Sequence, residues 1–156
     1  MTINFEEGRV PEVKFYRVEW TDPRSNTTTK PTTADVTELV RRSRAQLPIA
    51  TMDVSTSELT YTGPVTVRSD GRGLTSSFLI NINSSLNLRR RLDLCFTSLG
   101  CDTQYYGVLR GSGAGGIAES IPGASSSGIM PANNFAYGRN RHNHEIAHTL
   151  GIRHAT

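Results

Sequence analysis

The chain has 156 residues, of which 36% are hydrophobic and 20% are charged, and it carries a formal net charge of +3. This length suits a single domain, and the composition is that of a globular protein on the polar side. The sequence contains no apolar run of about 18 residues, which excludes a membrane-spanning helix, and its first residues lack the charged start and apolar core of a signal peptide.

The first predicted element is a strand over residues 11–20. Val13 and Phe15 alternate with polar neighbours, and Val18 and Trp20 alternate again after a shift of one residue. Alternation with period two indicates a strand, and a shift in its phase favours a β-bulge.

A helix is predicted over residues 33–47. Thr32 is a good N-cap, and Asp35 follows three residues later as in a capping box, while Pro48 marks the end. The apolar positions recur at helical spacing, which predicts one core-facing side. That side carries Val36, Leu39, Val40, Ser43 and Leu47.

Short strands are then expected near residues 52–62 and 75–80, with a turn at residues 69–73 between them. A second helix is predicted over residues 85–99. Its apolar side would carry Leu88, Leu92, Cys95 and Leu99.

Residues 104–109 predict a buried strand, and residues 110–116 are rich in glycine. This glycine-rich segment is no phosphate loop, because it lacks the Lys-Ser/Thr ending and precedes a predicted strand. Residues 123–143, rich in Gly, Ser, Pro and Asn, are expected to form a long irregular connection. The order of elements indicates an α/β or α+β fold with a mixed sheet.

Two cysteines, Cys95 and Cys101, lie between the second helix and the next strand. Their separation permits a short disulfide loop, which an oxidising compartment would favour. Two buried thiols are the alternative interpretation.

Arginines are clustered on both predicted helices, at Arg41, Arg42 and Arg44 and at Arg89, Arg90 and Arg91. Such clusters can contact nucleic acid. The total charge is small and no aromatic residues are interleaved, so we interpret both clusters as solvated helix faces and expect no nucleic-acid partner.

The most informative segment is HEIAHTLGIRH, which begins at His144. On a helix over residues 144–150, His144 and His148 lie four residues apart on one face and can bind the same metal ion. Gly151 can adopt the left-handed conformation that ends a helix, so that the chain turns and brings His154 to the same ion. Three imidazole ligands leave the fourth position of a tetrahedral zinc open, as catalytic zinc requires.

Glu145 follows the first ligand but points about 100° around the helix, so it suits a general base better than a fourth ligand. Zinc lowers the pKa of a bound water to about 7 and polarises a carbonyl group. Glu145 would accept the proton of that water and return it to a leaving amine. His142, two residues before the first ligand, is interpreted as a surface residue outside the metal site.

The segment matches the H-E-x-x-H-x-x-G-x-x-H signature and resembles the metzincin zinc endopeptidases at every fixed position. This resemblance implies that His144, His148 and His154 bind one catalytic zinc ion and that Glu145 is the catalytic base. Gly151 would make the turn between the second and third ligands.

The segment Gly115–Gly123 is similar to the edge strand of metzincins, which pairs with an extended substrate, although an ordinary glycine-rich strand and turn would read alike. The resemblance assigns substrate binding to Gly116, Ile117, Ala118 and Glu119. It also implies an N-terminal subdomain with a twisted, mixed, mostly parallel sheet. The sheet would have an antiparallel edge strand and pack against long helices that include the zinc helix.

Two features depart from the family pattern. Metzincins have a methionine-containing turn beyond the third histidine, whereas here Met130 precedes the motif and only two residues follow His154. Ala155 indicates no particular subfamily. We therefore expect residues 1–156 to be one catalytic domain that is truncated after the third histidine, without its C-terminal subdomain.

The sequence thus predicts a secreted or cell-envelope zinc endopeptidase that cleaves protein or peptide substrates. The alternative is a non-catalytic, zinc-containing binding module that retains the metallopeptidase fold. Cleavage of a protein mixture that a chelator blocks and zinc restores would distinguish the two.

Overall fold

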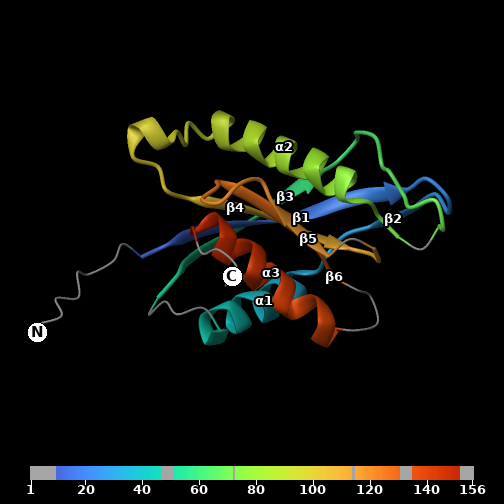
Figure 1. The fold of residues 1–156 in the computed structure, drawn as a ribbon, viewed down its shortest axis with the longest axis horizontal. Coiled ribbons are helices and arrows are strands. Elements are labelled where there is room, and N and C mark those ends of the chain that lie inside the picture. The colour runs from blue at the N-terminus through green and yellow to red at the C-terminus, as the bar shows by residue number, and fades with distance from the viewer. Residues whose placement is uncertain (1–9, 47–50, 72, 114, 131–134, 152–156) are drawn as a thin grey trace, which may run out of the picture.

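The computed structural model describes residues 10–46, 51–71, 73–113, 115–130 and 135–151. A sheet of six strands separates two layers of helices (Figure 1). The elements in chain order are β1 (Glu12–Asp22), β2 (Thr27–Thr29), α1 (Thr33–Gln46), β3 (Asp53–Thr60), α2 (Ser76–Leu92), the 3-10 helix η1 (Thr97–Leu99), β4 (Gln104–Arg110), β5 (Gly116–Ala118), β6 (Ser125–Met130) and α3 (Phe135–Thr149).

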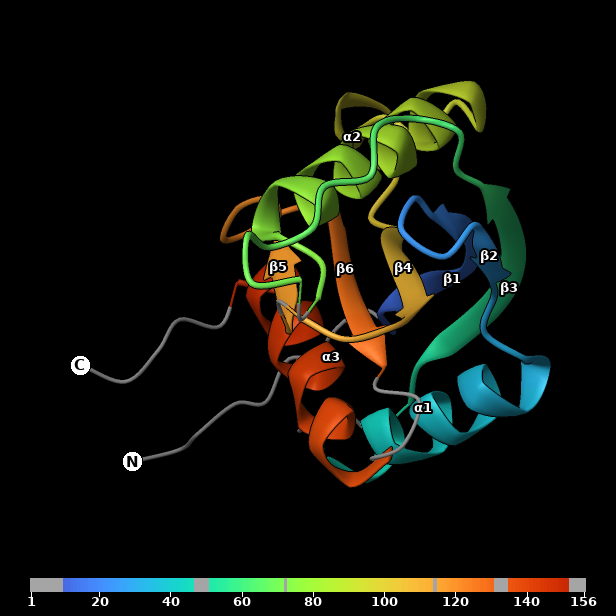
Figure 2. The same cartoon turned by 90° about the vertical axis from the view of Figure 1, so that its right-hand side faces the viewer.

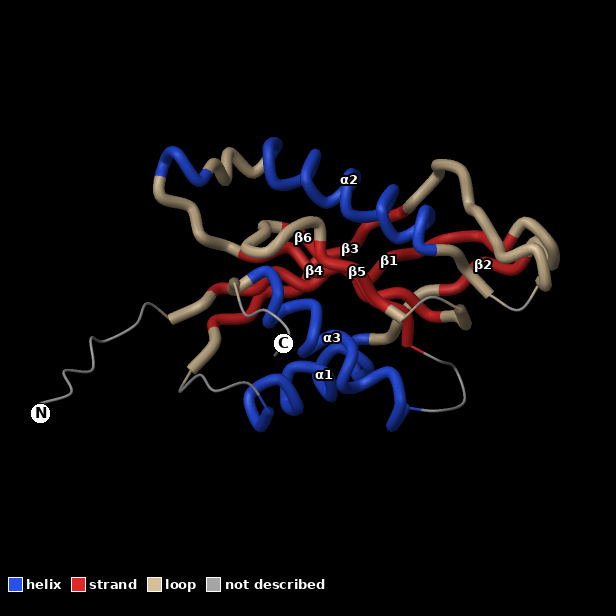
Figure 3. The backbone as a smooth tube through the Cα atoms, viewed as in Figure 1, coloured by secondary structure: helices blue, strands red, loops and turns tan. Residues whose placement is uncertain are grey.

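The sheet has the strand order β2-β1-β4-β6-β5, and β3 pairs with β1. Strands β3, β1, β4 and β6 run parallel, whereas β2 and β5 are antiparallel to their partners. The expected mixed α/β architecture, with a mostly parallel sheet and an antiparallel edge strand, is therefore confirmed. Helix α2 covers one face of the sheet, and α1 and α3 lie together on the other (Figures 2 and 3).

Strand β1 is regular, and the expected bulge is wrong. Its register with β3 runs without a break from Glu12 to Glu19. Val13 and Phe15 pack on the α1 and α3 side, whereas Val18 and Trp20 pack on the α2 side. The shift in alternation therefore arises because a central parallel strand is buried on both faces.

Helix α1 begins as the sequence predicts. The Thr32 hydroxyl accepts a hydrogen bond from the Asp35 amide at 3.2 Å, and the Asp35 carboxylate accepts one from the Thr32 amide at 2.7 Å. These reciprocal bonds satisfy two amides at the helix start. Val36, Leu39 and Ser43 are buried as expected, whereas Leu47 lies outside the described residues.

Helix α2 corrects two predictions, because residues 75–80 form its start rather than a strand, and it ends before residue 99. Thr75 is the N-cap, and its side chain accepts a hydrogen bond from the Phe78 amide at 3.3 Å. The buried side of the helix carries Phe78, Leu79, Ile82, Asn83 and Leu86. The predicted apolar side is exposed at Leu88, Leu92 and Leu99.

Strand β6 lies within the segment that was expected to be irregular, so that expectation is also wrong. All six of its residues are buried, including Ser125, Ser126 and Ser127. Ser125 and Ser127 fit because α2 lies close to this face of the sheet, where a Cβ atom at Gly107 would already meet Ile82 at 3.0 Å. The Ser127 hydroxyl donates to the Leu79 carbonyl oxygen at 3.3 Å, which satisfies a polar group in the core.

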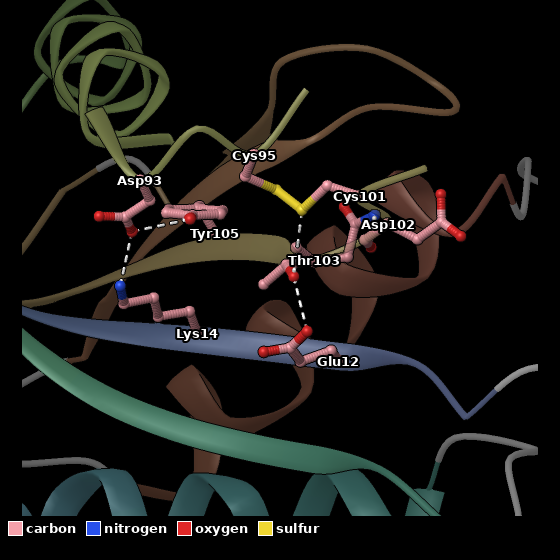
Figure 4. Close-up of a disulfide and its surroundings, with 9 residues drawn as sticks. Glu12, Lys14, Asp93, Cys95, Cys101, Asp102, Thr103 and Tyr105 are labelled. Atoms are coloured by element: carbon pink, nitrogen blue, oxygen red, sulfur yellow. Dashed lines mark hydrogen bonds and ion pairs between the residues drawn. A yellow bond between two sulfur atoms is a disulfide. The ribbon is translucent and has the colours of Figure 1, made fainter. Parts of the chain in front are cut away.

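Cys95 and Cys101 form a disulfide between the end of the α2 segment and the start of β4 (Figure 4). Beside it, the Asp93 carboxylate accepts hydrogen bonds from Lys14 at 2.6 Å and from the Tyr105 hydroxyl at 2.8 Å. The disulfide interpretation of the cysteine pair is therefore the one that the structure supports.

None of the helices in the described part of the chain is long and apolar enough to cross a membrane.

Candidate metal centre

Helix α3 carries the predicted metal motif on the same face of the sheet as α1. Ile146 is fully buried among Val13, Phe15 and Tyr106, and Leu150 packs against that cluster. This apolar side anchors the helix, as its spacing of four residues predicts. The polar residues of the motif are thereby held at fixed positions beside the sheet.

The end of α3 has the expected glycine turn. Gly151 has a φ of +94°, which favours glycine, and its amide donates to the His148 carbonyl oxygen at 2.9 Å. The helix therefore stops directly after the second histidine. His154, the predicted third ligand, lies outside the described residues.

His144 and His148 converge as two ligands of one ion would. Their Nε2 atoms are 3.0 Å apart, and their ring centroids are separated by 4.3 Å. Two nitrogens at 2.0–2.1 Å from a tetrahedral zinc ion would lie about 3.3 Å apart. The observed spacing is therefore close to what shared coordination needs, and it also suits a hydrogen bond between neutral rings.

The chemistry of these donors fits zinc, for which imidazole nitrogen is a preferred ligand. His144 is exposed and His148 is largely buried, so the pair lies at the protein surface with one side open. Among the residues that the structure describes, no group of three or more His, Cys, Asp or Glu side chains could hold a metal. The predicted third ligand, His154, is not among these residues.

Glu145 is 8% exposed and lies against the edge strand β5. A Cβ atom at Gly116 would come within 2.7 Å of its Cγ and 3.1 Å of its Oε1. The carboxylate therefore occupies the space that any side chain at Gly116 would fill. The base candidate and the predicted substrate strand are thus direct neighbours.

Strand β5 presents one edge of its backbone away from the sheet. The Gly115 carbonyl oxygen accepts from Ile129, and the Glu119 amide donates to Ser125, so both residues bond toward β6. Because backbone groups alternate along a strand, Gly116 and Ala118 direct theirs to the open edge. Of the four predicted substrate-binding residues, Gly116 and Ala118 thus have backbone groups that point to the open edge of the sheet. The backbone groups of Ile117 and Glu119 point toward β6.

Two asparagines that the sequence analysis did not identify hold β5 from the α2 side. The Asn83 amide donates to the Ile117 carbonyl oxygen at 3.1 Å, and the Asn87 amide donates to the Glu119 carboxylate at 2.6 Å. They lie four residues apart on one helix, which is the only signal that the sequence contains. They fix the edge strand against the layer above it.

His142 is buried, so its interpretation as a surface residue is wrong. It is 2% exposed, and its Nε2 lies 3.0 Å from the Ser43 hydroxyl and 3.2 Å from the Leu39 carbonyl oxygen. Helix α3 extends well before the motif and packs on α1, which encloses this ring. His142 links the two helices and is not part of the convergent pair.

Tyr106 of β4 is a further buried polar residue near the site, which the sequence did not single out. It is 1% exposed, and its hydroxyl has no hydrogen-bond partner among the described residues. Burial, with a smaller contribution from the charge of Glu145, raises the pKa of Tyr106 well above its usual value. Its hydroxyl therefore keeps its proton and remains a hydrogen-bond donor.

Comparisons with known protein families, curated proteins and solved structures found no match.

Proposed function

We propose that this chain is a secreted or cell-envelope zinc endopeptidase of metzincin type. The observation that carries the proposal is the approach of the His144 and His148 Nε2 atoms to 3.0 Å, on a helix that ends at a glycine turn. His154 would supply the third ligand.

The arrangement of β5 and α3 lends independent support. The edge strand is antiparallel, lies beside the motif helix and directs the backbone groups of Gly116 and Ala118 outward. An extended peptide can add to such an edge through main-chain hydrogen bonds. A substrate bound there would pass beside Glu145, because that side chain lies against Gly116.

The residues of the site would divide the work of peptide hydrolysis. The histidines would hold zinc, which when bound supplies a Lewis acid and an activated water. Glu145 would take up a proton at its carboxylate and deliver it to the nitrogen of the leaving amine. Gly116 and Ala118 would align the substrate main chain, so that the scissile bond lies next to the carboxylate.

The decisive experiment measures cleavage of fluorescently labelled casein by the full chain with added zinc. We expect 1,10-phenanthroline to stop cleavage and zinc to restore it. Glu145→Ala should abolish cleavage while zinc binding, followed by calorimetry, is retained.

Glu38→Ala is the matched control, because Glu38 is a half-buried glutamate on α1, away from the motif, that pairs with Arg41 and Arg42. This variant should cleave as the wild type does. Zinc binding without any cleavage by the wild type would instead favour the non-catalytic binding module. Cleavage by Glu145→Ala at the wild-type rate would show that the base is wrongly assigned.

A further inference from the structure

Two glycines are paired between β5 and β6, and a side chain from another element lies over each of them. Gly116 and Gly128 are directly paired in the register of the two strands. A Cβ atom at Gly116 would lie 2.7 Å from Glu145 Cγ, and one at Gly128 would lie 2.2 Å from the Tyr106 hydroxyl oxygen. We call this pair the glycine seat.

The register of the two strands places Glu145 and Tyr106 over neighbouring positions of the sheet. Directly opposed residues of antiparallel strands have Cβ positions about 4.5–5.5 Å apart. The Glu145 carboxylate lies over one of these positions and the Tyr106 hydroxyl over the other, and the charge of Glu145 acts on that hydroxyl. Two ordinary side chains at the seat would exclude both groups.

The Tyr106 hydroxyl needs an acceptor in this position. It is fully buried and has no partner among the described residues. A buried hydroxyl without a hydrogen bond is costly, and native proteins rarely leave one. A carboxylate is the strongest acceptor that a neutral hydroxyl can find. Glu145, whose charge acts on this hydroxyl, carries the carboxylate that lies across the seat.

We propose that the glycine seat and the Tyr106 hydroxyl are positioning elements for Glu145. The glycines leave room for its carboxylate against the edge strand, and the hydroxyl donates a hydrogen bond that holds it there, directly or across one water. The importance of this position rests on the proposed role of Glu145 as base. The packing itself does not depend on catalysis.

The steric part is tested by thermal unfolding of the full chain. Gly116→Ala should lower the melting temperature by about 3–10 °C, because the added methyl group overlaps Glu145. Most of that loss should disappear in a Glu145→Ala background, which removes the overlapping atoms. Equal losses in both backgrounds would overturn the steric role of Gly116.

A second cycle tests the other glycine in the same way. Gly128→Ala should destabilise the wild type, and Tyr106→Phe should relieve the overlap, because the next ring atom would lie at an ordinary 3.4 Å. Gly107→Ala is the matched control, since it contacts Ile82 and Leu86 on the opposite face. The change in melting temperature caused by Gly107→Ala should be the same in the wild type and in the Glu145 and Tyr106 variants.

The hydrogen bond is tested with Tyr106→Phe against Tyr105→Phe, which removes a hydroxyl on the other face of the same strand. We expect Tyr106→Phe to lower kcat on casein by about tenfold or more, with KM and zinc affinity nearly unchanged. Gly116→Ala should lower kcat by about 100-fold, since a misplacement near 1 Å has that effect. A kcat for Tyr106→Phe equal to that of Tyr105→Phe would overturn the donor role.

Stability separates failure of this inference from failure of the proposed function. Tyr106→Phe and Glu145→Ala should be non-additive in melting temperature even if the chain hydrolyses nothing. Additive effects would overturn the contact between Tyr106 and Glu145, whether or not the chain is a protease.

Discussion

The two faces of the sheet bury different polar side chains, with neutral amide and hydroxyl groups on the α2 face and histidines and a glutamate on the other. On the α2 face, aromatic and aliphatic residues pack around Phe78, whose ring lies 5.6 Å from that of Trp20. On the other face, α3 buries His142, Glu145 and His148 beside an equally apolar cluster. Burying polar groups costs free energy unless they are partnered. The α2 face therefore serves stability, and the α3 face is where we place the proposed chemistry.

The largest expected effect concerns two histidines of α3, both on the face where we place the proposed chemistry. We expect His148→Ala to weaken zinc binding by more than about 100-fold, since outer partners of metal ligands alone contribute up to that much, and to abolish hydrolysis. His142→Gln should leave zinc affinity unchanged while destabilising the contact with α1. Calorimetric zinc titration of both variants checks this. An equal loss of zinc affinity in both would contradict the separate roles of His148 and His142.

The core on the α2 face should show the reverse pattern. Phe78→Ala removes a fully buried ring and should cost about 3–5 kcal/mol in the free energy of unfolding. Zinc affinity of the folded protein should not change. Leu88→Ala, on the exposed side of the same helix, should cost less than about 0.5 kcal/mol. Urea denaturation of the three proteins measures the contrast, which an equal effect at both positions would contradict.

Removal of the disulfide should lower the free energy of unfolding by less than Phe78→Ala does, on the same face of the sheet. Replacing Cys95 and Cys101 together by serine opens a loop with a sequence separation of 6, which should cost about 2 kcal/mol. Hydrolysis at a temperature where the variant stays folded should equal that of the wild type. Loss of activity without loss of stability would mean that the disulfide acts on the metal centre instead.

The smallest effect concerns pH. The hydrogen bond from Lys14 lowers the pKa of Asp93, with a further contribution from the Tyr105 hydroxyl, so the unfolded state has the higher pKa. The stabilisation is therefore present above about pH 4 and is lost as pH falls through the lowered pKa. Because the pair is partly exposed, we expect less than about 1 kcal/mol.

Asp93→Asn isolates this contribution. Urea unfolding at pH 6 and pH 3 should show that the wild type loses more stability than the variant on acidification. The Lys14 pKa is raised by the same bond, so a second loss should occur only above about pH 10.5. A difference between the proteins that did not change between pH 6 and pH 3 would contradict the assignment.

Local signals in the sequence were sufficient for several elements. The capping box at Thr32 and Asp35 forms as predicted, and so does the buried strand at residues 104–109, which is β4. Neighbouring residues dictate both. The turn at Gly151 was also predictable, because its glycine directly follows the last helical residues. The spacing of His144 and His148 predicted their convergence for the same reason.

Other elements depended on distant contacts. The serines of β6 resemble a loop sequence, and only the close approach of α2 at Gly107 makes small polar residues suitable for a buried strand. Burial of β1 on both faces produced an apparent bulge in its pattern. His142 became buried because α1 packs over it, which no feature near the motif indicates.

The sequence by itself determined the metal motif, the helix that carries it and the turn that ends that helix, because each depends on residues a few positions apart. Only the tertiary structure placed Glu145 over Gly116 and Tyr106 beside Gly128, because strand register brings together residues that are far apart in the chain. The spacing of His144 and His148 is thus a local property, whereas the position of Glu145 depends on the pairing of the edge strand.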